Sequence, residues 1–371
     1  MDRYHRQRIL PEIGPEGQKR LERAHVAIVG VGALGTVIAD VLARAGVGRL
    51  TLIDRDVVEL TNLQRQTLYE EADAEAGVPK AEAARRKIAR VNSTIQVEAL
   101  VEDFNAGNAL RLLGIAGDER PAAIVDGLDN FEARYLMNDI AVSEGIGYVY
   151  GGAVGTSGMT ASFLPHSAQA TPWSDAEATP CLRCVFPEAP PVGSMPTCDT
   201  AGVLGALTVT VGAIEAAEAI KIVTSDFAAV NRDLISLELW SRGGIEVRKV
   251  SMAGAWRAGE CPCCGKREYS YLHEEVNVDA AGAVSLCGRN AVQIQPGGTG
   301  QARVDLAVIA DRLRAAAQGG RVMQSPMMLR AEVSESGVTY EITLFGSGRA
   351  IIKGTSDPAR GRALYARYVG V

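Results

Sequence analysis

The sequence predicts an α/β fold: a doubly wound, mostly parallel sheet with helices on both faces, followed by a small α+β domain. Three observations support this class. Short apolar segments alternate with helical patterns through the first half of the chain. A glycine-rich turn joins the first of these segments to a helix. A cysteine-rich knot at Cys261–Lys266 closes the first domain before the pattern changes near Tyr271.

The length predicts two domains, because 371 residues exceed the usual size of one. We place them at residues 1–270 and 271–371. Hydrophobic residues make up 47% of the chain, which is enough to bury a core in each. The net charge of −6 argues against broad binding to nucleic acid or to anionic membranes.

The first half is expected to supply the parallel strands. Leu34, Ile38, Val41 and Ala45 fall on one helical face, and Pro79–Val91 is a helix with proline near its first turn. The four strands expected here are Val26–Val29, Leu50–Ile53, Ala122–Val125 and Tyr148–Tyr150.

A long proline-rich loop, Gln169–Asp199, interrupts the pattern, and loops of this length are usually functional or disordered. A helix at Val203–Val223 and strands at Leu234–Leu239 and Glu246–Val250 follow it. In the second domain we expect a helix behind Asp305 as N-cap, a hairpin, and a last helix. The apolar stripe of the first helix is Leu306, Ile309, Ala310 and Leu313, the hairpin runs from Val338–Phe345 into Arg349–Ile352, and Asp357–Pro358 opens the last helix.

The chain is expected to be a cytoplasmic protein without membrane spans. Met1–Arg8 is charged and lacks a signal-peptide pattern, and the apolar stretch Val203–Ile214 is too short to cross a bilayer. The seven cysteines are an odd number in a long chain with no export signal. They favour metal or thiol chemistry over disulfides.

The glycine-rich turn is the first candidate site. Gly30, Gly32, Ala33 and Gly35 lie in a Gly-x-Gly-x-x-Gly pattern, and Asp54 ends the next strand. Such glycines let the backbone approach phosphate at a helix N-terminus, while Asp54 is placed to bind a ribose. The pattern predicts a Rossmann-like nucleotide site. Taken alone, it is more often an NAD or FAD site than an ATP site.

The polar residues after the second strand change that balance toward ATP. Hydride transfer needs no cluster of amide and basic side chains there, whereas cleavage of a triphosphate does, because charge builds on the phosphoryl oxygens. As isolated residues, Arg65 and Lys80 are more simply surface charges. The cluster consists of Asp56, Asn62, Arg65, Gln66 and Lys80.

A third set of polar residues follows the strand Ala122–Val125. Carboxyl ends of parallel strands line the ligand crevice of an open α/β sheet. A carboxylate there can hold magnesium, although it can also cap the helix near Phe131. We interpret Asp126 as structural and Asp129, next to Asn130, as directed at the metal.

These motifs together resemble the ThiF/MoeB/HesA family of ubiquitin-activating-enzyme-like adenylyltransferases. The resemblance covers Arg3 to about Lys266 and rests on Arg3-Tyr4-His5-Arg6-Gln7, the glycine motif, Asp54, Asn62-Leu63-Gln64-Arg65-Gln66, Lys80 and Asp129-Asn130. It implies ATP and Mg²⁺, attack of the terminal glycine carboxylate of a small ubiquitin-like carrier on the α-phosphate, and release of pyrophosphate.

The resemblance also implies roles for single residues. Asp54 holds the ribose, Asn62, Arg65 and Lys80 contact phosphates, and Asp129 holds magnesium. Arg6 resembles an arginine that reaches into the partner subunit's site, which implies a homodimer; otherwise it is a surface residue. Ala33 replaces the glycine that many members carry, and its methyl group is expected to fit.

Two cysteine pairs are candidate metal ligands. Cys181-x-x-Cys184 and Cys261-x-x-Cys264 can supply four thiolates to a closed structural zinc site. Their separation is much longer than in a zinc ribbon, but the family places paired cysteines in the same two regions. Cys263 is an alternative ligand, and unpaired reduced cysteines are the competing interpretation.

Cys198 is the candidate thiol for a covalent step. It lies just before a helix, whose dipole stabilises a thiolate, and it matches a family cysteine that in some members takes the carrier as a thioester or acyl persulfide. A buried small side chain is the alternative. Cys287 could relay sulfur, although a core or surface thiol is the simpler interpretation.

The main expectation is therefore adenylylation of a carrier ending in Gly-Gly, with a possible sulfurtransferase as a further partner. Alternatives are conjugation through Cys198, an NAD-dependent oxidoreductase, and a scaffold that binds a ubiquitin-like protein without catalysis. The second domain is either a docking module or a buttress for the fold.

Overall fold

The computed structural model describes residues 2–115, 117, 120–189, 198–256, 259–273, 283–286, 290–294, 304–316, 321–324, 328–335 and 337–370. These residues form two compact units. The first holds the described residues up to 70, from 79 to 189 and from 198 to 273. The second holds 71–78 and the described residues from 283 onward.

The first unit is built on an eight-stranded sheet of order β3-β2-β1-β4-β5-β6-β7-β8. The first five strands in this order are parallel, and the last three continue the sheet antiparallel. The strands are β1 (His25–Val29), β2 (Arg49–Ile53), β3 (Gln96–Leu100), β4 (Ala123–Asp126), β5 (Gly147–Val154), β6 (Ser157–Phe163), β7 (Asp233–Ser241) and β8 (Gly244–Ser251).

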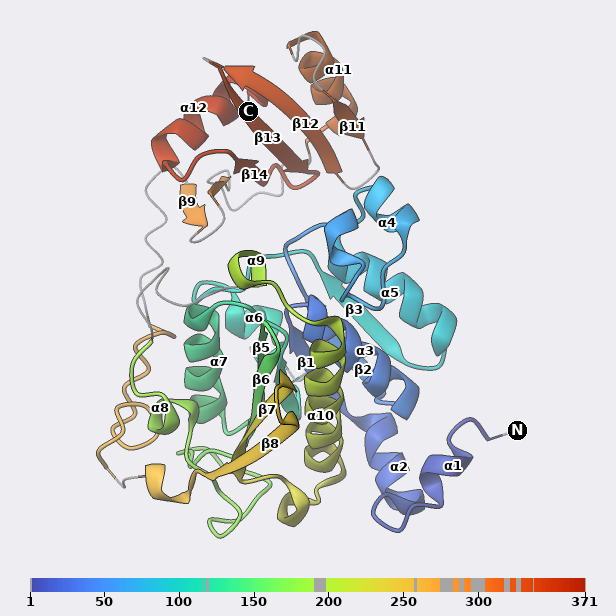
Figure 1. Cartoon of the computed structure of the whole chain (residues 1–371), viewed down its shortest axis with the longest axis vertical. Helices are drawn as coiled ribbons and strands as arrows, with labels where there is room; N and C mark the ends of the chain where they lie inside the picture. Colours follow the sequence, from blue (N-terminus) through green and yellow to red (C-terminus); the bar gives the residue numbers. More distant parts are fainter. Residues whose placement is uncertain are drawn as a thin grey trace. The chain divides into compact units, whose positions relative to one another are not determined.

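Helices cover both faces of this sheet, as the sequence predicts (Figure 1). On one face α3, α5 and α10 pack beside one another, and α6 and α7 lie on the other. The α-helices described in the first unit are α1 (His5–Arg8), α2 (Gly14–Arg23), α3 (Ala33–Ala45), α5 (Lys80–Val91), α6 (Ala109–Leu112), α7 (Phe131–Glu144), α8 (Leu182–Val185), α9 (Cys198–Ala201) and α10 (Gly205–Thr224).

Strand burial explains why these segments pair in parallel. The central strands β1, β2 and β4 are buried along almost their whole length, as expected for strands covered by helices on both faces. The strand order changes direction between β1 and β4, because β2 and β3 lie on one side of β1 while β4 and β5 lie on the other. At this point Val29 of β1 lies opposite Asp126 of β4. Ligands of doubly wound sheets bind at such a switch point.

The antiparallel extension is longer than the sequence indicates. The strand expected at Tyr148–Tyr150 runs on to Val154 and pairs with β6, which was not predicted. The expected helix at Val203–Val223 begins later, at Gly205, because Val203 forms a bridge with Gly155 in the turn between β5 and β6.

The second unit contains an antiparallel six-stranded sheet of order β11-β12-β13-β14-β10-β9. Two helices share its core with the sheet. The predicted cap Asp305 accepts a main-chain hydrogen bond at the start of the first, and Asp357, expected only to open the second, accepts one there as well. Its elements are α4 (Glu71–Glu75), β9 (Ala283–Leu286), β10 (Ala291–Ile294), α11 (Leu306–Ala316), β11 (Val322–Gln324), β12 (Met328–Glu335), β13 (Val338–Phe345), β14 (Ala350–Lys353) and α12 (Pro358–Tyr368).

Among the described residues, no helix combines the length and the apolar character that crossing a membrane requires.

Candidate nucleotide and metal sites

The glycine motif lies between β1 and α3, at the switch point of the sheet. Gly30 has a φ of +86°, and a Cβ there would lie 2.6 Å from the carbonyl carbon and oxygen of Gly127. A Cβ on Gly35 would lie 2.0 Å from the Gly30 oxygen. These two glycines are therefore required for packing. At Gly32 a Cβ would meet nothing closer than 3.8 Å, so packing alone does not require glycine at this position.

Asp54 fastens the glycine turn to the end of β2. Its Oδ2 accepts a hydrogen bond of 2.8 Å from the Val31 amide, and its Oδ1 accepts one of 2.7 Å from the Asp56 amide. Burial raises the pKa of the Asp54 carboxyl, and the positive charge of Lys80 opposes that rise. The main chain thus already holds in place the Asp54 carboxylate, which is predicted to bind the ribose.

Lys80 and Asp56 form an ion pair beside this turn. The Lys80 Nζ lies 3.2 Å from Asp56 Oδ2, and Lys80 is only 8% exposed, at the start of α5. The amide of Lys80 also donates to the Asp56 carbonyl. The structure therefore brings Asp54, Asp56 and Lys80 together, as the sequence-based cluster requires.

The Asn62–Gln66 segment lies against the same turn. Asn62 is buried, and its Oδ1 accepts from the Glu59 amide in a reciprocal cap. The buried Gln66 has its Nε2 near Gly32, while its Oε1 has no hydrogen-bond partner among the described residues. Arg65 is half-buried and donates to the Thr61 carbonyl. The Gln66 side chain therefore brings a buried acceptor without a partner among the described residues close to the glycine turn.

The residues after β4 divide into buried and exposed ones. Asp126 is fully buried, and its oxygens accept from the Leu128 amide, Arg134 and Tyr148. Asp129 is exposed, and Asn130 caps α7 by accepting from the Ala133 amide at 2.9 Å. Because Asn130 supplies the cap, the Asp129 carboxylate is not needed for it.

Two buried residues at this site were missed from the sequence. Arg134 of α7 lies 2.9 Å from Asp126, and Glu215 of α10 is fully buried without a hydrogen-bond partner in the described chain. The feature of the sequence that could have identified them is a charged residue within an otherwise apolar helical segment. In the sequence, Glu215 indicates only that the apolar stretch before it does not span a membrane.

Three other candidates stand apart from the turn in the sequence. Arg6 is exposed on α1, and Cys198 is the first residue of α9. Glycine contacts bring the start of α10, just after α9, against the Arg65 segment: a Cβ on Gly205 would lie 2.8 Å from the Gln64 oxygen. Cys287 lies outside the described residues.

The four predicted metal ligands converge in one cluster. The sulfur atoms of Cys181, Cys184, Cys261 and Cys264 all lie within 4.8 Å of one another. Pairs among them are 3.8, 3.8 and 3.4 Å apart. A tetrahedral zinc with bonds of about 2.3 Å needs sulfurs about 3.8 Å apart, so this donor set fits zinc.

Cys263 lies beside this cluster but is not one of its four donors. Asn138 of α7 donates from Nδ2 to the Cys263 sulfur at 3.3 Å and accepts at Oδ1 from the Leu182 amide at 2.8 Å. One asparagine thus links both cysteine loops, and hydrogen bonds of this kind orient metal ligands.

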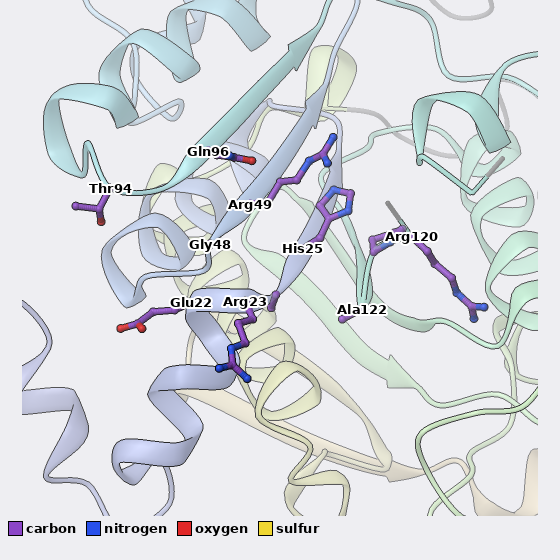
Figure 2. A pocket seen from close by; sticks show the side chains of 11 residues that line it. Glu22, Arg23, His25, Gly48, Arg49, Thr94, Gln96, Arg120 and Ala122 are labelled. Atoms are coloured by element: carbon purple, nitrogen blue, oxygen red, sulfur yellow. The ribbon is translucent and has the colours of Figure 1, made fainter. Parts of the chain in front are cut away.

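A separate open pocket of about 680 Å³ lies at the amino ends of β1 and β2 (Figure 2), away from the glycine turn. His25 and Arg49 extend side by side in it, while the guanidinium groups of Arg23 and Arg120 point elsewhere. Arg49 pairs with Glu98, and Arg120 donates to the Gly145 carbonyl. These basic groups do not converge on a common point.

The fold and the glycine-turn site define an α/β nucleotide-binding enzyme with a separate four-thiol cluster. A model of the ThiF family matches residues 4–259. The chain belongs to this family, so the expected family and its adenylyltransferase class are confirmed.

Curated relatives extend the likeness. The chain is 39% identical over 368 residues to the "Sulfur carrier protein ThiS adenylyltransferase" of Bacillus subtilis, covering 99% of each chain. It is 41% identical over 267 residues to the "Sulfur carrier protein adenylyltransferase" of Thermus thermophilus, covering 71% of this chain and 91% of the relative. A crystal structure of E. coli MccB with ATP has a TM-score of 0.56 at 22% identity, covering 71% of this chain and 75% of that one, and shows a shared fold.

Proposed function

We propose that this enzyme uses ATP to adenylylate the C-terminal glycine carboxylate of a small ubiquitin-like sulfur carrier, with release of pyrophosphate. The observation that carries the proposal is the 39% identity to the ThiS adenylyltransferase of B. subtilis along 99% of both chains. The match includes the second unit, so it extends beyond the shared nucleotide-binding domain.

Different residues at the turn would bind different parts of ATP. The backbone of Gly32 and the start of α3 would receive phosphates, and Asp54 would bind the ribose. Lys80, Asn62, Arg65 and Gln66 surround the phosphates and stabilise the charge that develops on them. Magnesium held by Asp129 would neutralise phosphate oxygens and help pyrophosphate to leave.

The four-thiol cluster would hold a structural zinc ion. All four donors come from protein thiols, which leaves no position for a substrate. The cysteines of the two loops are free thiols rather than disulfides, which supports action in the reducing cytoplasm.

Cys198 would act after adenylylation. A thiolate there would attack the carrier's acyl adenylate, forming a thioester and releasing AMP. A sulfurtransferase would be the further partner for sulfur delivery. Use of the same thioester for conjugation is a second candidate, favoured by 36% identity over 287 residues to the "SAMP-activating enzyme E1" of Haloferax volcanii, which covers 77% of this chain and 96% of that protein.

A homodimer would complete the site with Arg6 of the other subunit. The exposed Ile9 and Leu10, which are 66% and 49% accessible just after α1, support an interface at this end. Light scattering should give the mass of a dimer. An inactive Arg6→Ala chain mixed with an inactive Asp129→Ala chain should regain activity, since one site of the hybrid is intact; no recovery would contradict the shared site.

The decisive experiment is ATP–pyrophosphate exchange with purified ThiS-type carriers that end in Gly-Gly. Exchange should require the carrier, and Asp129→Ala should abolish it while the melting temperature stays unchanged. The carrier truncated by its last glycine is the matched control. Exchange without any carrier, or normal exchange by Asp129→Ala, would contradict the proposal.

A further inference from the structure

The main chain of Leu128 is held at both of its polar atoms. Asp126 Oδ1 accepts a 2.8 Å hydrogen bond from the Leu128 amide, and Arg134 Nη2 donates a 2.7 Å hydrogen bond to the Leu128 carbonyl. Leu128 directly precedes Asp129. The two charged residues therefore fix the two peptide units on either side of Leu128, the second of which leads into Asp129.

The two charges are themselves rigidly placed. Asp126 is fully buried and Arg134 is 5% exposed, and Nε lies 2.9 Å from Oδ2. Tyr148 donates its hydroxyl to the same carboxylate oxygen at 3.1 Å, and Arg134 Nη2 also donates to the Gly151 carbonyl at 2.7 Å. The guanidinium lies over the rings of Phe131 and Tyr150 as well.

This clamped segment touches the glycine turn. The Gly127 amide donates to the Val29 carbonyl at 2.8 Å, and a Cβ on Gly30 would come within 3.0 Å of the Leu128 nitrogen. A displacement of Leu128 would therefore disturb the turn that is proposed to bind phosphates. The position of Asp129 relative to those phosphates depends on the clamp.

Glu215 is the third charged group in this interior. Its carboxyl packs on Gly151, where a Cβ would lie 2.3 Å from Cδ, and it has no hydrogen-bond partner among the described residues. The charged or titratable groups that face it are Asp126, Arg134 and Tyr150. Burial, and then the negative charge of Asp126, raise the pKa of Glu215 well above its ordinary value of 4.5. Arg134 pairs with Asp126, whereas no hydrogen bond links it to Glu215.

We propose that Arg134 is a positioning residue that, together with Asp126, clamps Leu128 and so sets the place of Asp129, and hence of the magnesium ion that Asp129 is proposed to hold. This inference rests on the proposed function. It adds to that function a dependence of magnesium use on a residue that does not touch ATP.

The test compares wild type with Arg134→Lys in carrier-dependent ATP–pyrophosphate exchange, with free Mg²⁺ varied at constant total ATP. Lysine keeps the charge but cannot hold Asp126 and Leu128 through two nitrogens. The half-saturating free Mg²⁺ should rise by about tenfold, as expected for one lost hydrogen bond to a charged group. The KM for carrier should not change.

The matched control is Arg20→Lys, since Arg20 donates to the Thr224 carbonyl at 2.5 Å, away from the turn. It should keep the wild-type Mg²⁺ curve. Tyr148→Phe removes only one hydroxyl from Asp126 and serves if Arg134→Lys does not fold; it should raise the Mg²⁺ requirement about threefold.

The outcomes separate the two proposals. A wild-type enzyme that shows no carrier-dependent exchange would overturn the proposed function. If wild type exchanges and the folded variants lose rate at every Mg²⁺ concentration without a shift of the curve, Arg134 is merely structural and the inference is overturned.

Discussion

Replacing Asp54 should lower the free energy of unfolding, because its carboxylate holds the glycine turn. The carboxylate accepts two main-chain hydrogen bonds, from Val31 at 2.8 Å and from Asp56 at 2.7 Å. Hydrogen bonds to a charged group contribute about 1.5–3 kcal/mol each. Because burial raises the pKa of Asp54, we take the lower end of that range. Asp54→Ala should then cost about 3 kcal/mol, and Asp54→Asn, which keeps one acceptor, about 1.5 kcal/mol.

Urea unfolding followed by tryptophan fluorescence measures this loss. The chain has three tryptophans, all in the first unit, and only Trp173 is buried, whereas Trp240 and Trp256 are 74% and 40% exposed. The signal therefore reports unfolding of the unit that contains Asp54. The difference between the urea midpoints of variant and wild type, multiplied by the slope, gives the change in free energy of unfolding.

The control is Asp40→Asn, which breaks an exposed ion pair with Arg44 on α3 and should cost less than about 0.5 kcal/mol. Saturating ATP should raise the midpoint of wild type and raise those of the two Asp54 variants less. Equal midpoints for wild type and Asp54→Ala would refute the reasoning, since they would mean that the two hydrogen bonds do not stabilise the turn.

Three further results are expected. Glu215→Gln should become more stable relative to wild type as the pH rises above about 4.5, because the folded wild type must keep a proton that its unfolded chain releases. Urea midpoints of both proteins at about pH 5 and pH 8 test this. A difference between the two midpoints that does not change with pH would contradict it. Cys184→Ser should lower the zinc content from about one ion per chain to near zero, while Cys263→Ser keeps it; metal loss from both would point to Cys263 as a ligand. Cys198→Ala should still support exchange but form no thiol-linked carrier adduct on gel electrophoresis, and an adduct that persists would exclude Cys198 as the acceptor.

Local motifs made much of the fold and site predictable. The order strand, glycine turn, helix requires only neighbouring residues, so the sequence was enough to place Gly30, Gly35 and Asp54. Cysteines spaced by two residues likewise identify a ligand pair without knowledge of their surroundings. These features depend on chain geometry over a few residues.

The unpredicted features depend on partners far apart in the sequence. In the sequence, Arg134 and Glu215 cannot be told from ordinary surface charges. Only the placement of β5 shows their role, because the Gly151 carbonyl accepts a hydrogen bond from Arg134 and Gly151 packs against the Glu215 carboxyl. The strand β6 was missed because its central residues Gly158, Met159 and Thr160 show no clear apolar alternation. Tertiary pairing decides such cases.

The four-cysteine cluster also has a consequence for biosynthesis. Cys181 and Cys261 are 80 residues apart, and the second pair lies near the end of the first unit. All eight strands of the sheet, and Asn138 on α7, precede that pair in the sequence, since β8 ends at Ser251. Closing the cluster is then the last step in maturation of this unit. Loss of the proposed zinc ion should therefore release the two cysteine loops while the sheet stays folded.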